Sequence, residues 1–335
     1  MDGFVRCYLD CYLKNIPRNS LHDRRRRQDV VDYISVLIQG LSEVKIDEDG
    51  SAVEAIKTII KYHDEQKDNN GKVCIMGKYH NILYVAVKLC YVWQIKDAET
   101  IGLLLKEIYK CETTFERILI GAIFGNKAPH YIAGWKSDFD SEEENLRAVV
   151  YFLDKANKSK LEFNLNSGNQ MTTFRFIDLP IESCGKASAL KVCVQLGLPD
   201  KLLIFLRFGA QVYTQNEDIT VLEHVMNRLL EFNHVYPYNL VSCLQLLLRA
   251  IDCIRIDNDH YSDKILLVRI YERYADLIED GILPPQRCSL IPPELKHLCR
   301  CVVRDILWKN YQLPDGIRML NLPKKLWRYL DLLED

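Results

Sequence analysis

Two short stretches near the C-terminus decide how this chain can be interpreted. Residues 295–303 read Leu-Lys-His-Leu-Cys-Arg-Cys-Val-Val, and residues 320–330 read Leu-Asn-Leu-Pro-Lys-Lys-Leu-Trp-Arg-Tyr-Leu. Leu295, Cys299 and Val303 follow one another at intervals of four residues, so a helix through them carries one apolar stripe. A helix with such a face can enter a groove of a partner protein.

Neighbouring residues define the rest of this predicted helix. Three apolar residues widen the stripe: Leu298, Val302 and Ile306. Three basic residues are expected elsewhere on the helix surface: Lys296, Arg300 and Arg304. An apolar stripe without its partner faces water, which predicts poor solubility when the protein is expressed alone.

The order and spacing of these residues resemble a SOCS box over residues 292–335. In that family a Leu and a Cys of the first helix enter a pocket of elongin C, and a later Leu-Pro segment with a helix ending near Tyr-Leu selects cullin five. The resemblance implies these elongin-binding residues: Leu295, Leu298, Cys299 and Val303. It implies these cullin-binding residues: Leu320, Leu322, Pro323, Leu326, Tyr329 and Leu330.

Two positions depart from the family pattern. Glu294 stands where the family usually has a small residue or proline, and Asn321 stands where the first proline of the cullin segment is expected. The resemblance therefore supports elongin binding better than the choice between cullin five and cullin two. A plainer interpretation is also open: an apolar Leu-Cys-Val stripe is often part of a core, because Cys behaves as a small buried hydrophobe.

Composition and charge restrict the class of protein. The 335 residues are 48% hydrophobic, which is enough for one large or two modest packed domains. The formal net charge of -2 predicts no general attraction to nucleic acid or to an anionic membrane. Residues 1–13 form an expected amphipathic helix and not a signal peptide, and no uncharged stretch approaches bilayer length.

Twelve cysteines are scattered through the chain, and none has the Cys-x-x-Cys spacing of a common zinc site. We therefore expect reduced thiols in the cytosol or nucleus, with no metal and no cofactor. Phosphate-binding, dinucleotide-binding and hydrolase motifs are missing from the sequence, so we expect no catalytic residues.

Helical periodicity dominates the chain and predicts an all-α fold. The expected helices cover residues 28–44, 52–63, 81–91, 97–109, 116–124, 146–155, 187–196, 200–208, 221–232, 240–250 and 263–279. The expected loops cover residues 68–72, 136–144 and 164–173.

Weak internal repetition accompanies this periodicity. Residues 188–210 resemble an ankyrin repeat, in which Gly197 allows the turn between two helices and Gly209 ends the second helix. A second unit begins at Thr220, close to the period of about 33 residues typical of ankyrin repeats. More eroded units are expected from residue 81 and from residue 128.

Degenerate ankyrin units followed by a SOCS box are similar to the ankyrin repeat and SOCS box family. This resemblance implies a helical N-terminal region, a repeat region, a connecting helix with a linker, and a SOCS box, with these bounds: 1–75, 76–255, 256–291 and 292–335. It implies a substrate-recognition adaptor that binds elongin C, elongin B, cullin five with its RING protein, and an unidentified protein target. The turns before Ser188 and near residues 216–220 are expected to line the target surface.

Two other classes of function remain open. A plain ankyrin scaffold would use its C-terminal helices only to cap the solenoid. A cryptic enzyme in the N-terminal region would need a pocket where Cys, His and carboxylates converge. Residues 24–27, four arginines, are expected to be a solvated lead-in to a helix, and Ser141 with Glu144 is expected to be a helix capping box.

Overall fold

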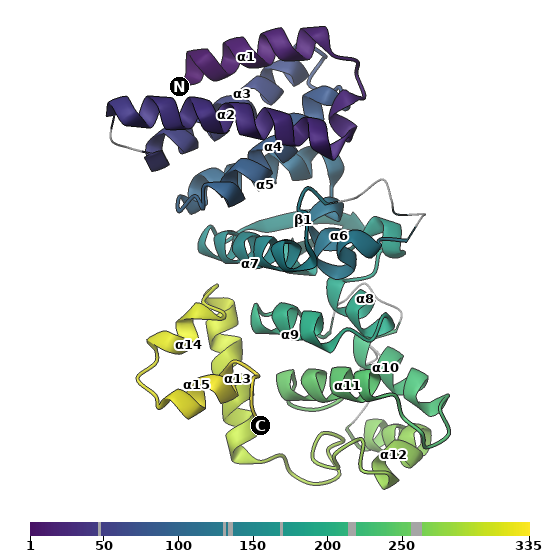
Figure 1. The fold of residues 1–335 in the computed structure, drawn as a ribbon. Coiled ribbons are helices and arrows are strands. Elements are labelled where there is room, and N and C mark those ends of the chain that lie inside the picture. The colour runs from purple at the N-terminus through teal and green to yellow at the C-terminus, as the bar shows by residue number, and fades with distance from the viewer. Residues whose placement is uncertain (46–47, 130–131, 133–136, 168–169, 214–218, 256–262) are drawn as a thin grey trace. The chain divides into compact units, whose positions relative to one another are not determined.

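The chain folds into two compact units, Met1–Thr173 and Phe174–Asp335. The computed structural model describes residues 1–45, 48–129, 132, 137–167, 170–213, 219–255 and 263–335. Helices dominate both units, which confirms the predicted all-α class (Figure 1). Within this described part, no helix combines the length and the apolar character needed to cross a membrane.

The first unit is a stack of helical hairpins. Its helices are α1 (Asp2–Asn15), α2 (Arg24–Lys45), α3 (Glu48–Asp68), α4 (Lys78–Val92), α5 (Ala98–Glu112), α6 (Glu116–Phe124) and α7 (Glu142–Lys158). Helix α2 packs on α4, α3 packs on α5, and α5 packs on α7. The expected boundary at residue 75 thus lies within this unit, and the N-terminal helices belong to the same stack as the segment that follows.

The four arginines at the start of α2 are not all solvated, and the expectation was wrong for Arg27. Its side chain is 3% exposed and forms an ion pair with Asp138 at 2.5 Å. The same guanidinium donates a hydrogen bond to the carbonyl oxygen of Leu21 at 2.5 Å. A buried charge is tolerated when it is paired and hydrogen-bonded in this way. Farther along, Ser141 Oγ accepts the N–H of Glu144 at 3.0 Å and caps α7, which is one half of the predicted capping box. The Glu144 carboxylate accepts the N–H of Asp140 at 2.9 Å.

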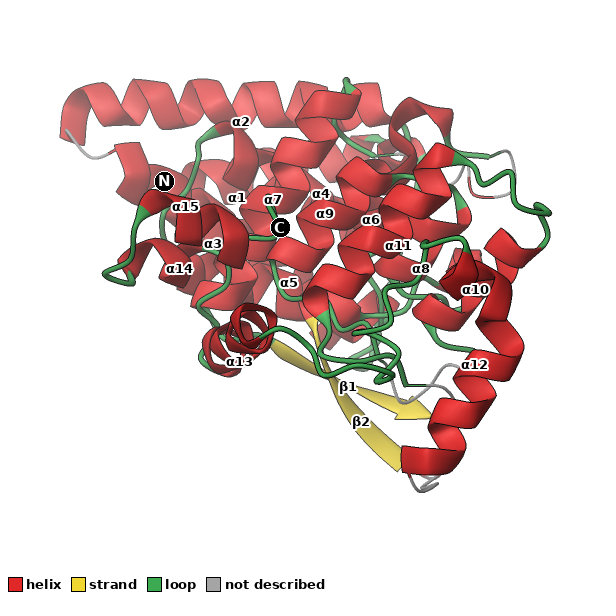
Figure 2. Ribbon diagram, turned by 90° about the horizontal axis from the view of Figure 1, so that it is seen from below, coloured by secondary structure: helices red, strands yellow, loops and turns green. Residues whose placement is uncertain are grey.

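A β-hairpin follows α7, where the sequence predicted a loop. Strands β1 (Glu162–Ser167) and β2 (Gln170–Arg175) pair as a two-stranded sheet, shown in yellow in Figure 2. Phe163 of β1 is buried, and its ring lies 4.6 Å from that of Tyr109 and 5.2 Å from that of Phe115. The polar residues of this segment suggested a loop, but one buried aromatic side chain holds the first strand against the helices.

The second unit contains the expected repeat helices and the C-terminal segment. Its helices are α8 (Ala189–Gln195), α9 (Pro199–Arg207), α10 (Val221–Leu230), α11 (Tyr238–Ala250), α12 (Asp263–Glu279), α13 (Leu295–Lys309), α14 (Asp315–Met319) and α15 (Lys324–Leu330). Helix α8 packs on α10 and α9 packs on α11, so equivalent helices of successive pairs stack on one another. This is the arrangement expected of a helical solenoid.

Two glycines in this unit have the roles that the sequence predicts. Gly197 (φ 63°) turns the chain between α8 and α9, and Gly209 (φ 88°) follows α9. A Cβ atom at Gly209 would lie only 2.6 Å from the Trp308 ring, so α13 packs directly on this glycine. Thr220 and Glu223 form a complete capping box at the start of α10. Residues 216–218 of the expected target-binding turn lie outside the described residues.

Candidate protein-docking site

Helix α13 presents an apolar stripe to solvent. Leu295 is 77% exposed, Val302 is 58% exposed and Ile306 is 53% exposed, and Cys299 between them is also exposed. Successive members are four, three and four residues apart, so they share one face of the helix. Isolated exposed apolar side chains are common, but a continuous stripe on a helix is typical of an interaction surface.

The opposite face of α13 is polar and buried, which corrects the expectation that Arg300 and Arg304 lie on the surface. Arg300 is 2% exposed and Arg304 is 7% exposed. The Arg304 guanidinium donates hydrogen bonds to the carbonyl oxygen of Leu206 at 2.6 Å and to that of Leu330 at 2.8 Å. These carbonyl groups lie in α9 and at the end of α15, so one arginine ties three helices together. Burial lowers the pKa of Arg304 to about 10, and the group remains protonated at neutral pH.

A histidine continues this buried polar face. His297 Nε2 lies 2.7 Å from the carbonyl oxygen of Ile251, and its Nδ1 lies 2.9 Å from an Arg300 nitrogen. Since Arg300 can only donate, His297 accepts at Nδ1 and donates from Nε2, which is the neutral tautomer. Burial lowers the pKa of His297, and Arg287 and Arg300 lower it further against the opposing hydrogen bond to Ile251.

The predicted elongin-binding residues do not all lie on the exposed stripe. Leu295 and Cys299 lie on it, Leu298 is half-buried, and Val303 is turned inward. Val303 packs with other partly buried side chains against a small core of Leu307, Leu313, Ile317 and Leu330. Leu298 and Val302 line a hollow of about 430 Å³ beside α13. The structure therefore replaces Val303 on the stripe with Val302 and Ile306.

The predicted cullin-binding residues divide into exposed and buried groups. Pro323 and Leu326 are exposed, whereas Leu320 and Leu322 are half-buried against the same small core. The last two, Tyr329 and Leu330, are buried. Arg300 lies over the Tyr329 ring at 4.2 Å, and Lys296 covers it at 3.9 Å. Tyr329 and Leu330 are thus placed to hold α15 on α13, whereas Pro323 and Leu326 face solvent.

Ion pairs anchor the C-terminal segment within the second unit. Arg207 of α9 pairs with Asp331 at 2.6 Å, and Arg249 of α11 pairs with Asp335 at 2.6 Å. Arg175 of β2 lies between the rings of Trp308 and Tyr311, at 3.9 and 3.8 Å. The last three helices are therefore fixed against the solenoid through polar and cation–π contacts, while the apolar stripe of α13 remains exposed.

Comparison with known proteins assigns this segment. The family model for the SOCS box matches residues 291–331. Residues 291–331 form a SOCS box. The Ankyrin repeat and SOCS box protein 17 sequences of Homo sapiens and Macaca fascicularis are each 51% identical to this chain over 41 residues, which are 12% of this chain and 14% of each relative. The SOCS box and these partial matches support the ankyrin repeat and SOCS box family, which is the resemblance found in the sequence. No solved structure matches the chain.

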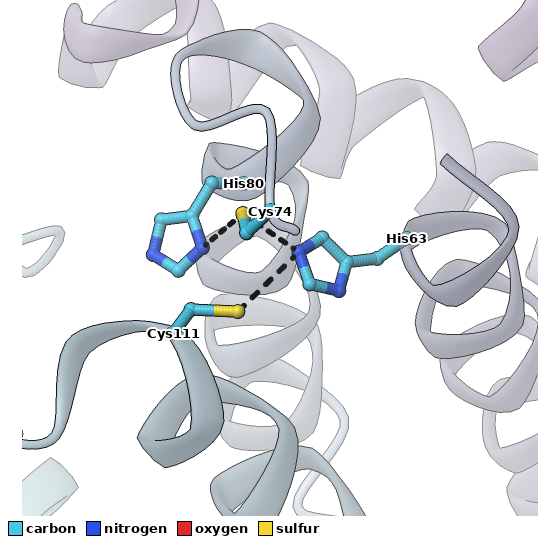
Figure 3. A group of neighbouring side chains, drawn as sticks. All are labelled: His63, Cys74, His80 and Cys111. Atoms are coloured by element: carbon cyan, nitrogen blue, oxygen red, sulfur yellow. Dashed lines mark hydrogen bonds between the residues drawn. The ribbon is translucent and has the colours of Figure 1, made fainter. Parts of the chain in front are cut away.

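A group of side chains that could bind a metal ion lies in the first unit, and it was not predicted from the sequence. His63 of α3, Cys74 of the segment 69–77, His80 of α4 and Cys111 of α5 each offer a ligand atom, and these four atoms lie within 4.8 Å of one another. Figure 3 shows the four side chains turned toward one another. Their positions in the sequence have no familiar metal-ligand spacing, because they come from three helices and a connecting segment. Only Cys74 and His80, six residues apart, could have given a local signal.

Proposed function

We propose that this protein is a substrate-recognition adaptor of a cullin-RING ubiquitin ligase. It recruits elongin C, and through it elongin B, with the exposed stripe of α13. The observation that carries the proposal is a SOCS box helix on which Leu295, Val302 and Ile306 face solvent while its arginines are buried. Such a helix has the form that inserts into a hydrophobic groove.

The orientation of α13 argues against the plain scaffold alternative. A helix that only capped the solenoid would bury its apolar side chains against α9 and α11. Instead Leu295 and Ile306 are exposed, and Arg304 provides the contact with α9. Arg304 already fixes this segment, so its outward apolar face is not needed to hold the helix in place. This favours a partner protein that covers that face.

The adaptor itself would break no bonds. Its repeat region would hold a protein target near the ubiquitin-conjugating enzyme of the ligase and so raise the effective concentration of a target lysine. Pro323 and Leu326, which are exposed on α15 and the residue before it, are the proposed contacts with cullin five and its RING protein. We propose that this assembly works in the cytoplasm, with the nucleus as a further site.

Copurification with elongins tests the proposal. We expect the wild-type chain, co-expressed with elongins B and C, to form a stoichiometric complex. Leu295→Ala with Cys299→Ala should weaken this complex by about 2 kcal/mol or more, because truncation of a central buried anchor commonly has such an effect. Pull-downs and titration calorimetry measure the loss, and competition between cullins five and two in the same assay reads the cullin preference.

Val235→Ala provides the matched control for this experiment. Val235 is 79% exposed, nearly the same as Leu295, but lies outside the SOCS box. The control should bind elongins as the wild type does. If the double variant still copurifies with elongins at the wild-type level, the adaptor proposal is wrong and the scaffold alternative gains support.

A further inference from the structure

We propose that His63, Cys74, His80 and Cys111 of the first unit bind a structural zinc ion. The two histidines are 0% and 2% exposed, and the two cysteines are partly buried. Four nitrogen and sulfur ligands without a water position are typical of structural zinc sites. The site would join α3, the segment 69–77, α4 and α5.

The observed separations match those of a tetrahedral ion. Zinc bonds of about 2.3 Å to sulfur and about 2.05 Å to nitrogen place neighbouring nitrogen and sulfur ligands about 3.6 Å apart at the tetrahedral angle. Cys74 Sγ lies 3.3 Å from His63 Nε2 and 3.7 Å from His80 Nδ1, and Cys111 Sγ lies 3.8 Å from His63 Nε2. The ligand atoms therefore need to move only a few tenths of an ångström to surround one ion.

Both histidines are held by carboxylates through the nitrogen that faces away from the thiols. His63 Nδ1 lies 3.1 Å from Glu107, and His80 Nε2 lies 2.6 Å from Glu112. Carboxylate–histidine pairs of this kind fix the tautomer and the ring orientation of zinc ligands. The backbone N–H of Met76 also points at Cys74 Sγ at 3.4 Å, which stabilises a thiolate. The surroundings thus prepare three of the four donor atoms, those of His63, His80 and Cys74, for a cation.

Charge and ligand type favour zinc at this position. Two thiolates neutralise a divalent ion, so the ion and its four ligands together carry no net charge when both imidazoles are neutral. Zinc binding to the two thiols would release their protons to solvent.

A neighbouring group, His63 with Asp64 and Glu107, is a weaker candidate for the ion. Lys67 pairs with both Asp64 and Glu107, and Lys110 also pairs with Glu107. These carboxylates are already neutralised by ammonium groups. The thiol and imidazole set is therefore the better ligand set.

The cluster also meets part of the requirement for a cryptic cysteine enzyme. Cys74 contacts His80 and His80 contacts Glu112, as a nucleophile contacts its base and the base contacts an orienting acid. A nucleophile needs one histidine and an open approach for substrate. Here a second thiol and a second histidine converge on the same point. The convergence of all four favours metal binding over catalysis.

Metal analysis of the full-length protein, purified without chelators, tests the zinc proposal. Elemental analysis should find close to one zinc ion per chain. Replacing zinc with Co²⁺ should give the intense visible bands of a tetrahedral ion together with a thiolate-to-cobalt charge-transfer band. Cys74→Ala with Cys111→Ala should lose essentially all of the bound zinc, whereas Cys90→Ala, which removes a buried thiol of α4 outside the cluster, should keep it.

Alkylation of the wild-type protein keeps the test valid even if the double variant does not fold. Iodoacetamide should modify Cys74 slowly in the purified protein and faster after chelation, because zinc protects the thiolate. The proposal is overturned if the wild-type protein holds no zinc and gives no charge-transfer band with Co²⁺. Rapid alkylation of Cys74 in untreated protein would indicate the nucleophile instead, and a Cys74 to Cys111 disulfide in mass spectra would also overturn the zinc site.

Discussion

Helices α11 and α13 of the second unit have similarly amphipathic sequences, but α11 buries its apolar face and α13 buries its polar face. In α11 the leucines point inward, and Leu244 and Leu247 are fully buried. In α13 Leu295 is 77% exposed, while Arg300 and Arg304 are buried. An amphipathic pattern therefore identifies two faces, but the available hydrogen-bond partners help to decide which face is buried.

The largest expected effect is on the free energy of unfolding, when leucine is replaced by alanine on the apolar face of α11 and, for comparison, on that of α13. Leu247→Ala should lower the free energy of unfolding by about 2–5 kcal/mol, because it leaves a cavity in the core. Leu295→Ala should change it by less than about 0.5 kcal/mol, because the side chain is already in water. Urea unfolding of the two variants, followed by circular dichroism, measures the difference. Equal losses would show that Leu295 is packed within the isolated chain.

The sequence predicted the elements of this molecule better than their contacts. Periodicity identified α13, and the Leu and Cys spacing identified its apolar stripe, because both signals are local. The burial of Arg304 was not predictable in this way, since its partners Leu206 and Leu330 are 98 and 26 residues away. The stripe also shifts from Val303 to Val302, because α14 and α15 fold back and cover Val303.

The cluster in the first unit was beyond local reasoning for a similar reason. Cys111 lies 48 residues from His63 and reaches it only because α3 packs on α5. A familiar zinc motif depends on ligands close together in sequence. Where ligands come from separate helices, the fold has to be known before the site can be recognised. The β-hairpin was missed because its polar residues resemble those of a loop.

The second prediction tests the buried side of α13. Arg304→Met should lower the free energy of unfolding by about 1–3 kcal/mol, because the carbonyl groups of Leu206 and Leu330 lose their donor. Arg318→Met on α14 is the matched control, since Arg318 is exposed, and should have little effect. Thermal and urea unfolding measure both variants. An Arg304→Met protein as stable as the wild type would mean that desolvation of the guanidinium cancels its hydrogen bonds.

The smallest expected effect concerns His297 and pH. Its folded-state pKa is lowered, first by burial and then by Arg287 and Arg300, while the hydrogen bond to Ile251 and the charge of Glu294 oppose the shift. The unfolded state therefore binds more protons below the ordinary histidine pKa of about 6.5. The stability that neutral His297 contributes is present above that pH and is lost as the pH falls toward the folded-state pKa.

His297→Gln isolates this contribution from the other histidines. Glutamine can still donate to Ile251 and accept from Arg300, but it does not titrate. We would measure the unfolding midpoints of the wild type and the variant between neutral pH and about pH 5. As the pH falls over this range, the wild type should lose more stability than the variant. A backbone hydrogen bond and the Arg287 guanidinium lower the pKa of Glu294, and Arg300 is always protonated, so both charges stay constant while the histidine titrates. Parallel pH curves for the two proteins would show that His297 is not held neutral, and that the polar face of α13 is less enclosed than the apolar face of α11.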